Sequence, residues 1–448
     1  MFKTAGVGSM RRAFSGLSLV CLAVILGACA HPPTTDSVEP KSRVVENVAS
    51  KSTAELYADL ITPAVFERSS SKVIGGYTVE SGKLRMRDKS EGSLVTVRSP
   101  NGSLVSLVNK PGKSGLFLVN KQGLSTFSPE PYFDPAVEDG IPNIDDKKVS
   151  TASVNSASEE PKVVDVLLGY SRDAVDRVGG DAMAHALSQI ESVNLALRIS
   201  QASNVSLRLV GVQVVKQNYP TTTGTLGQLT TIFSAGMAQS VPDIIYGFFN
   251  ATPEDTALGW GYTGGRAGIG WAHSINTYRH EVGHNAGSSH CNTTGTANYR
   301  FGYNNGKTST ILCGQSTGYY STPALNDEFG LPRGDANTAD TARVWRENAV
   351  RLSSYAPPQS PPTAPADFAK VSSTASTITF IWSASPKAVR YEIYSVKNIG
   401  SPLPKKIGDS TALTFTATNI LGEALYFVKA VSFVEMVSPP SNSVVTTP

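Results

Sequence analysis

The chain has 448 residues, of which 40% are hydrophobic and 17% charged, and its formal net charge is +3. This composition is typical of a folded globular protein, and such a length allows about three domains. The near balance of charge excludes the strong basic footprint of a nucleic-acid-binding protein, so we expect no nucleic-acid partner.

The N-terminus has the layout of an export signal. Basic residues precede an apolar run over residues 16–28, and this run is shorter than the ~20 residues that span a bilayer. The run ends in Leu-Gly-Ala followed by Cys29, and this ending resembles the lipobox of bacterial lipoproteins. The resemblance implies a signal peptide over residues 1–28, lipidation of Cys29, and a protein that is exported and lipid-anchored to the bacterial cell envelope, in the outer membrane. The alternative is an ordinary signal cut after residue 28, with Cys29 incidental.

The cysteines predict one disulfide bond. Cys21 would leave with the signal peptide and Cys29 would carry lipid, which leaves Cys291 and Cys313 of the four cysteines. Because an exported protein meets oxidising conditions, we expect a disulfide between these two residues. Two free thiols are the alternative.

A tether and a small β-rich module follow the signal. Residues 29–53 are polar and contain prolines, which is typical of a flexible tether. Residues 54–150 contain short alternating runs separated by turn signals such as Asn101-Gly102, which predicts a β-rich module acting as a pro-segment or a spacer. This module contains no cysteine, so latency cannot use a thiolate on a metal, and we expect any inhibition to be steric. Residues 151–161 form a linker.

The central part, residues 162–357, alternates predicted strands with predicted helices and therefore indicates an α/β domain. Strands are expected over residues 163–170, 205–215 and 243–249, and helices over residues 181–200 and 339–352. In the first helix the apolar residues recur at helical spacing and His185 lies on the polar face, so we expect His185 to be exposed. Residues 264–271 are expected to be either a strand at the rim of a site, with which substrate backbone could pair, or a plain Gly-rich loop.

The C-terminal part is predicted to be a β-sandwich. A Pro-rich linker over residues 358–365 marks the boundary, and residues 366–448 show only strand patterns. Trp382 in an early strand and Tyr426 at the start of a late one resemble a fibronectin type III domain. A generic immunoglobulin-like sandwich is the alternative.

A short histidine-rich segment in the central domain carries the chemistry. His280 and His284 lie one helical turn apart, so both imidazoles can reach one ion. Gly287 can adopt a positive φ angle, which would end the helix and reverse the chain so that His290 reaches the same ion. Glu281 would lie toward the open side of the metal.

The number of ligands indicates catalysis. Three neutral histidines leave one position for water, which is the arrangement of a catalytic rather than a structural zinc site. Zinc lowers the pKa of such a water to ~7, and Glu281 could take its proton and pass it to a leaving amine. A fourth protein ligand would close the site and abolish hydrolysis, so we expect His273 to be structural.

The same string of histidines resembles the zinc signature of the metzincin metallopeptidases. Leu312 stands where this family carries the methionine of its Met-turn, and residues 319–323 and 334–343 resemble the tail of bacterial reprolysin-like domains. The resemblance covers residues 162–357 and implies a multidomain protein whose metzincin-like α/β (α+β) catalytic domain has a mixed twisted sheet and a zinc-binding helix. It also implies that Leu312 fills the space beneath the metal site as a near-isosteric replacement.

Three functions are compatible with these residues. The main hypothesis is a zinc-dependent metalloendopeptidase with one Zn²⁺ ion, a protein or peptide substrate and a monomeric state. The alternatives are an envelope adhesin or binding protein that retains a degenerate zinc-site scaffold, and a zinc amidase that acts on cell-wall peptides. The sequence shows no nucleotide-binding loop, so we expect no nucleotide partner.

Overall fold

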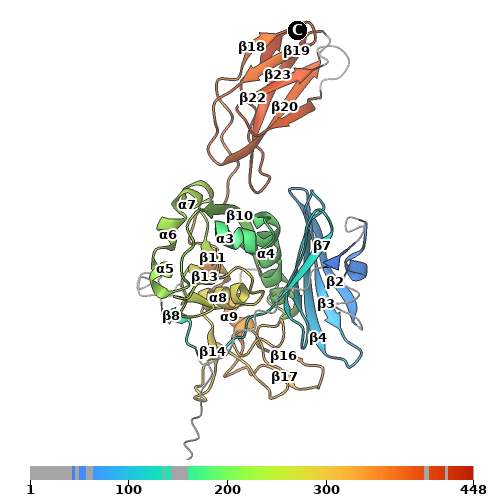
Figure 1. Cartoon of the computed structure of the whole chain (residues 1–448). Coiled ribbons are helices and arrows are strands. Elements are labelled where there is room, and N and C mark those ends of the chain that lie inside the picture. The colour runs from blue at the N-terminus through green and yellow to red at the C-terminus, as the bar shows by residue number, and fades with distance from the viewer. Residues whose placement is uncertain are drawn as a thin grey trace, which may run out of the picture. The chain divides into compact units, whose positions relative to one another are not determined.

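The computed structural model describes residues 43–45, 50–56, 64–134, 137–142, 160–397, 403–418 and 422–446, all within the unit Pro40–Pro448. The predicted signal peptide and Cys29 lie outside the described residues. The described chain is multidomain and mostly β, with some helices (Figure 1).

The N-terminal part forms a seven-stranded antiparallel sheet in the order β1-β7-β6-β5-β4-β3-β2. Its elements are β1 (Arg43–Val44), α1 (Thr53–Leu56), β2 (Val65–Ile74), β3 (Tyr77–Arg85), β4 (Glu91–Arg98), β5 (Leu104–Asn109), β6 (Gly115–Val119) and β7 (Leu124–Pro129). The turn between β4 and β5 contains Gly102 with a φ of 85°, a conformation that glycine adopts at little cost. The turn signals in the sequence therefore mark real strand connections.

A six-stranded mixed sheet lies in the central domain, in the order β10-β9-β11-β13-β12-β8. Its strands are β8 (Gly140–Pro142), β9 (Lys162–Ser171), β10 (Val205–Val215), β11 (Ile244–Phe249), β12 (Gly259–Thr263) and β13 (Ala267–Trp271). Strand β12 runs antiparallel to β13, and the other neighbours are parallel. The side chains of β11 are all buried, which explains its continuous apolar sequence. Strand β8 joins this sheet although its residues precede the central domain.

Helix α4 (Ala182–Ile199) is buried on nearly all sides. Asp181 caps its N-terminus by accepting a hydrogen bond from the backbone N–H of Ala184 at 2.9 Å. One side of α4 packs on β10, and another contacts β3, β4 and β5 of the N-terminal sheet (Figure 1). The helix therefore lies between two sheets.

This position makes the prediction of an exposed His185 wrong. The face that looks polar in the sequence packs on the central sheet, against Tyr170 of β9 and Phe248 of β11, and the His185 side chain is fully buried. Its Nδ1 atom lies 2.9 Å from the hydroxyl of Tyr170. Burial lowers the pKa of His185 to about 3, so the ring is neutral at ordinary pH.

The central domain also contains shorter elements. They are α3 (Arg172–Arg177), α5 (Thr223–Gly227), α6 (Leu229–Ile232), α7 (Ser234–Ser240), α8 (Thr277–Ala286), α9 (Thr341–Leu352), β14 (Ser289–Cys291), β15 (Phe301–Gly302), β16 (Thr322–Asn326) and β17 (Pro332–Arg333). Helix α8 contacts β12, β13 and α9. It therefore lies beside the end of the sheet to which β8 is added.

The C-terminal part consists of two antiparallel sheets. Their strands are β18 (Ala369–Ser373), β19 (Thr377–Ile381) and β22 (Thr414–Thr418) in one, and β20 (Ala388–Lys397), β21 (Lys405–Ser410), β23 (Ala424–Ser432) and β24 (Val444–Thr446) in the other. Trp382 and Tyr426 are buried in a core that both sheets share. This is the layout of a β-sandwich.

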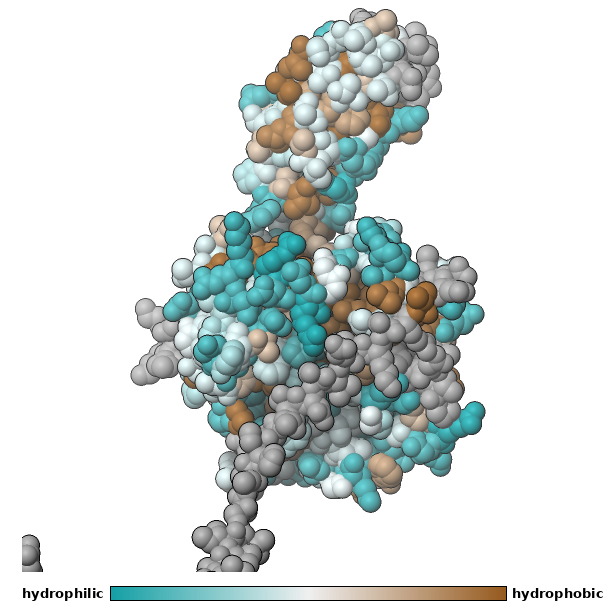
Figure 2. All heavy atoms as spheres, in the orientation of Figure 1, coloured by the Kyte–Doolittle hydropathy of each residue, from teal (hydrophilic) through white to brown (hydrophobic). Residues whose placement is uncertain are grey.

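Two observations bear on the surface. No helix among the described residues is long and apolar enough to cross a membrane. On the face in view in Figure 2, apolar side chains form small separate groups among hydrophilic ones.

Candidate metal centre

Helix α8 positions two of the three predicted histidine ligands. The Ser274 hydroxyl accepts a hydrogen bond from the backbone N–H of Thr277 at 3.1 Å, so Ser274 caps the first turn. Gly287 ends the helix with a φ of 109°, and the chain reverses there. At the same end, Arg351 of α9 donates hydrogen bonds to the carbonyl oxygens of Asn285 and Ala286, where a cation is favourable.

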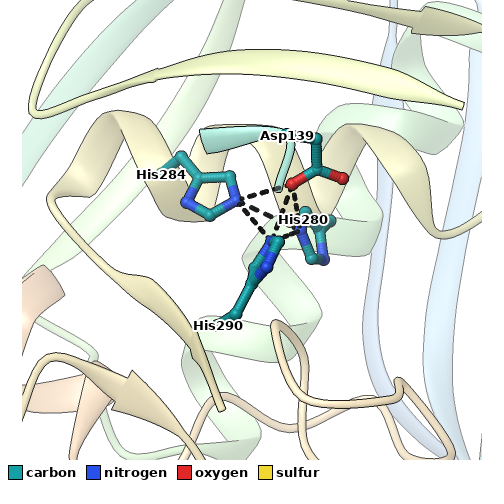
Figure 3. A group of neighbouring side chains, drawn as sticks. All are labelled: Asp139, His280, His284 and His290. Carbon is teal, nitrogen blue, oxygen red and sulfur yellow. Dashed lines mark hydrogen bonds and ion pairs between the residues drawn. The ribbon is translucent and has the colours of Figure 1, made fainter. Parts of the chain in front are cut away.

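The structure brings His280, His284 and His290 together (Figure 3). Their Nε2 atoms are separated by 3.1 Å (His280 to His284), 3.1 Å (His280 to His290) and 3.2 Å (His284 to His290). Zinc–nitrogen bonds of 2.0–2.1 Å in a tetrahedron place ligand nitrogens about 3.3 Å apart. The three rings therefore have the spacing that one zinc ion requires.

The orientation of the His284 ring supports the same conclusion. His284 Nδ1–H donates to the carbonyl oxygen of Ser288 at 2.8 Å, which leaves the Nε2 lone pair directed at the other two rings. Lone pairs on three converging nitrogens repel one another unless a cation lies between them. The residues present thus fit a divalent zinc ion.

A fourth side chain, Asp139, completes this group. Its Oδ1 atom lies 2.7 Å from Nε2 of His290, 3.2 Å from that of His284 and 3.3 Å from that of His280. Burial by itself would raise the pKa of Asp139, but attraction to the histidines and hydrogen bonds with them hold it well below its usual value. The expectation of a vacant fourth position is therefore wrong for this state of the protein.

Sequence reasoning missed Asp139 because it lies far from the histidines along the chain. Two further expectations change with it: residues 54–150 were expected to be only a pro-segment or a spacer, and any inhibition was expected to be steric. The absence of cysteine from residues 54–150 excludes a thiolate at the metal centre. The structure places the carboxylate of Asp139 there instead. The signal in the sequence was an Asp-Gly pair in the segment before the central domain. Gly140 is required there because a Cβ atom would lie 2.8 Å from ring atoms of His284.

Gln315 is a second residue that the sequence did not reveal. Its side-chain amide lies 3.2 Å from Nδ1 of His280, and Gln315 Oε1 has no partner among the described residues. Amide oxygen and nitrogen are interchangeable in such an assignment. With the amide turned, Oε1 accepts from His280 Nδ1–H, which satisfies both groups and directs Nε2 at the metal.

We expect Gln315→Ala to lower zinc affinity roughly 10–100-fold, the usual cost of losing a hydrogen bond to a metal-ligating histidine. Competition with a chromogenic chelator measures this. Gln315→Glu keeps an acceptor for His280 Nδ1–H and should retain most of the affinity. If Gln315→Ala and Gln315→Glu lose equal amounts of zinc affinity, the Gln315 side chain acts through packing and not through a hydrogen bond.

Glu281 follows His280 in α8 and faces strand β12. A Cβ atom at Gly259 would lie 2.5 Å from Glu281 Oε1, and one at Gly261 would lie 2.9 Å from Oε2. The glycines of β12 therefore make room for this carboxylate. Burial, followed by the nearby Asp139 charge, raises the pKa of Glu281 well above its usual value.

The segment that follows α8 borders the metal site and is held there by a disulfide bond. The predicted disulfide between Cys291 and Cys313 is confirmed, and it ties the residue after His290 to the loop that contains Leu312. Leu312 is fully buried, and its Cδ1 atom would lie 3.2 Å from a Cβ at Gly283 of α8. Leu312 therefore fills the space beneath the helix, as the sequence predicts.

Other predicted residues lie elsewhere. His273 is outside the cluster and stacks on Trp271, with ring centroids 5.3 Å apart. Residues 267–271 form β13, an inner strand between β11 and β12, and β8 is the last strand at that end of the sheet. Of the two alternatives for residues 264–271, the strand is therefore confirmed for residues 267–271, but its position at the rim is wrong.

Comparisons with known proteins agree with part of this description. Residues 160–330 match the Reprolysin_5 family model, metallo-peptidase family M12. This range contains the three histidines and Glu281 but not Asp139. A search of curated proteins gives no significant match.

Solved structures give more distant likenesses. The chain is similar to one described as a chaperone–substrate complex (25% identity, TM-score 0.38), over 58% of this chain and 41% of that chain. It is also similar over 19% of its length to an Fn3-like protein from Clostridium thermocellum (24% identity, TM-score 0.18, 92% of that chain). A human fibronectin type-III domain matches over 20% of this chain (21% identity, TM-score 0.19, 89% of that chain).

Proposed function

We propose that this protein is a zinc-dependent metalloendopeptidase with a metzincin-like catalytic domain. The observation that carries the proposal is the convergence of His280, His284 and His290, with Nε2 atoms 3.1–3.2 Å apart, beside a buried Glu281. The family match over residues 160–330 supports a metallopeptidase independently of this geometry.

The roles of the residues follow from their positions. The three histidines would hold the ion, and Gln315 and Ser288 orient two of their rings. A bound zinc would supply a Lewis acid that activates a water molecule at neutral pH. Glu281 is placed to take a proton from that water and to donate it to the departing amine. Strand β12 lies beside Glu281, and an extended peptide could pair with the β12 backbone once β8, which occupies this edge in the structure, has moved away.

Asp139 does not exclude this function. It belongs to the segment before the central domain, so movement of that segment would vacate the position without changing the three histidines. A degenerate binding protein has no need of a general base in the position of Glu281. A zinc amidase that acts on cell-wall peptides would use the same metal centre. No observation favours that function over cleavage of peptide bonds in proteins.

The decisive experiment is Glu281→Ala. We expect this change to reduce peptide cleavage by about 10²–10⁴, the contribution of a positioned general base, while zinc remains bound. Cleavage of an unbiased peptide library and metal content are measured in the native chain and in an Asp139→Ala background. Glu254→Ala, at an exposed glutamate, is the matched control. Unchanged cleavage in Glu281→Ala would refute the proposed mechanism.

We further propose that the protein is exported and held on the bacterial envelope as a monomer by lipid on Cys29. The support is the sequence before residue 30 alone. Partition into a detergent phase, lost in Cys29→Ser, tests this location.

A further inference from the structure

We propose that the disulfide between Cys291 and Cys313 is a redox switch of the metal centre. A low-molecular-weight thiol opens the bond by attack at Cys291, and the affinity of the protein for zinc then falls. This inference rests on the proposed function for the use of the metal. It adds to that function a site of covalent modification and a form of regulation.

The disulfide joins two segments that each hold part of the metal centre. Cys291 directly follows the ligand His290 in β14. On the other side of the bond, Cys313 lies two residues before Gln315, whose side-chain amide is 3.2 Å from Nδ1 of His280. The bond therefore fixes the third histidine relative to the residue that orients the first.

The loop on the Cys313 side has an unfavourable backbone conformation. Leu312 has a φ of 75° and Gln315 a φ of 54°, in the left-handed region that residues with a Cβ atom avoid. Such a conformation persists only where the surrounding structure enforces it, and the disulfide is a covalent constraint on this loop. Without the bond the loop can relax, which withdraws Leu312 from beneath α8 and Gln315 from His280.

A cavity of about 220 Å³ lies beside the disulfide and gives a small reagent access to it. Both cysteines line this cavity, together with Asn292, Tyr303 and Asn304. Cys291 is half-buried, whereas Cys313 is 1% exposed. Strand β15 packs directly against Cys313, because a Cβ atom at Gly302 would lie 2.8 Å from the Cys313 Cβ. A thiol that enters the cavity therefore reaches Cys291 first.

The exchange consists of two balanced steps. The thiolate of a small thiol attacks Cys291 Sγ and forms a new S–S bond, while the sulfur of Cys313 leaves with the electron pair of the old bond and takes a proton. A second small thiolate then attacks the added sulfur, which releases the thiol of Cys291 and a small disulfide. The protein disulfide is reduced, and two small thiols are oxidised.

Opening the bond weakens the attachment of the segment that carries His290. Strand β14 pairs with β15, and the Ser289 N–H donates to the Arg300 carbonyl oxygen at 2.7 Å. A short pair of strands is marginally stable by itself in water. The imidazole of His290 can then move away from the other two histidines, which lowers zinc affinity. Reoxidation restores the constraint.

The first experiment measures the zinc affinity of the full native chain, oxidised and after reduction by a phosphine, in competition with a chromogenic chelator. We expect at least roughly 10-fold weaker binding after reduction, the lower end of the cost of losing support for a metal ligand, with full recovery after reoxidation. Far-UV circular dichroism should stay unchanged. The matched control is Cys291→Ala/Cys313→Ala, whose affinity should not respond to the phosphine. Equal affinity in the two redox states, or loss of the fold on reduction, would overturn the switch.

The second experiment identifies the cysteine that reacts. The variants Cys313→Ser and Cys291→Ser each leave one thiol of the pair, and both are treated with hydroxyethyl disulfide and analysed by peptide mass mapping. We expect Cys291 to be modified at least 10-fold faster than Cys313. Should either variant fail to fold, limiting 2-mercaptoethanol on the native chain, quenched with acid and mapped, gives the same assignment. Equal rates, or faster reaction at Cys313, would overturn the role of Cys291.

The outcomes separate the switch from the enzymatic assignment. Weaker zinc binding after reduction, without peptide cleavage by the oxidised native or Asp139→Ala chain, supports the switch and overturns the peptidase proposal. Peptide cleavage together with equal zinc affinity in both redox states overturns the switch and leaves the peptidase proposal standing. A chain that binds no zinc in either state overturns both.

Discussion

Replacing His284 by alanine is expected to abolish zinc binding at micromolar metal and with it all peptide cleavage. His284 supplies one of three converging nitrogens, and its Nε2 lies 3.1 Å from that of His280. Loss of an outer hydrogen-bond partner alone costs roughly 10–100-fold in affinity. Loss of a ligand removes the metal bond itself and must cost more. Equilibrium dialysis and metal analysis measure the effect.

His273→Ala is the matched control for this change. His273 lies shortly before α8 but outside the cluster, and burial lowers its pKa to about 4, so it is neutral like a ligand. We expect the zinc affinity of the His273→Ala variant to equal that of the native chain. If both variants lose zinc equally, the effect is unfolding rather than ligation, and the ligand assignment loses its support.

Removing both cations around Glu191 is expected to destabilise the central domain by about 3–5 kcal/mol, because it leaves a buried carboxylate unpaired. Glu191 Oε2 lies 2.7 Å from Lys72 Nζ of β2, and Oε1 lies 2.7 Å from Arg198 Nη2. Burial by itself would raise the pKa of Glu191, but Lys72 and Arg198 lower it on balance. The double variant Lys72→Met/Arg198→Met is compared with the native chain by urea unfolding.

Adding Glu191→Leu to the double variant tests whether the unpaired carboxylate causes the loss of stability. An apolar group of similar size removes the stranded charge, so most of the lost stability should return. A loss of less than 1 kcal/mol in the double variant, or no recovery in the triple variant, would show that this network does not join the N-terminal sheet to α4.

Much of the candidate site could be predicted because it is local in the sequence. His280, Glu281 and His284 share one helix, and Gly287 turns the chain so that His290 returns. Helical periodicity and a single positive φ angle are enough to place these groups. The disulfide also followed from the sequence, because only two cysteines remained to pair in an exported protein.

The failures have one physical origin, which is packing between elements that lie far apart in the chain. Periodicity assigns faces to a helix but does not say what covers them, so the prediction of an exposed His185 fails because β9 and β11 cover that face of α4. The order of the strands is also beyond such patterns. Residues 259–263 and 267–271 are both Gly-rich, and only strand pairing shows that β12 lies between β13 and β8.

The sequence by itself determined the groups of the candidate metal centre: three imidazoles and a carboxylate within one helix and turn. Only the tertiary structure decided which further side chain joins them. Asp139 reaches His280 across 141 residues of sequence, a distance over which no periodicity or spacing carries information. Contacts of that kind arise from the packing of sheets and the pairing of edge strands, so a lone carboxylate joins the three histidines only when the fold brings it there.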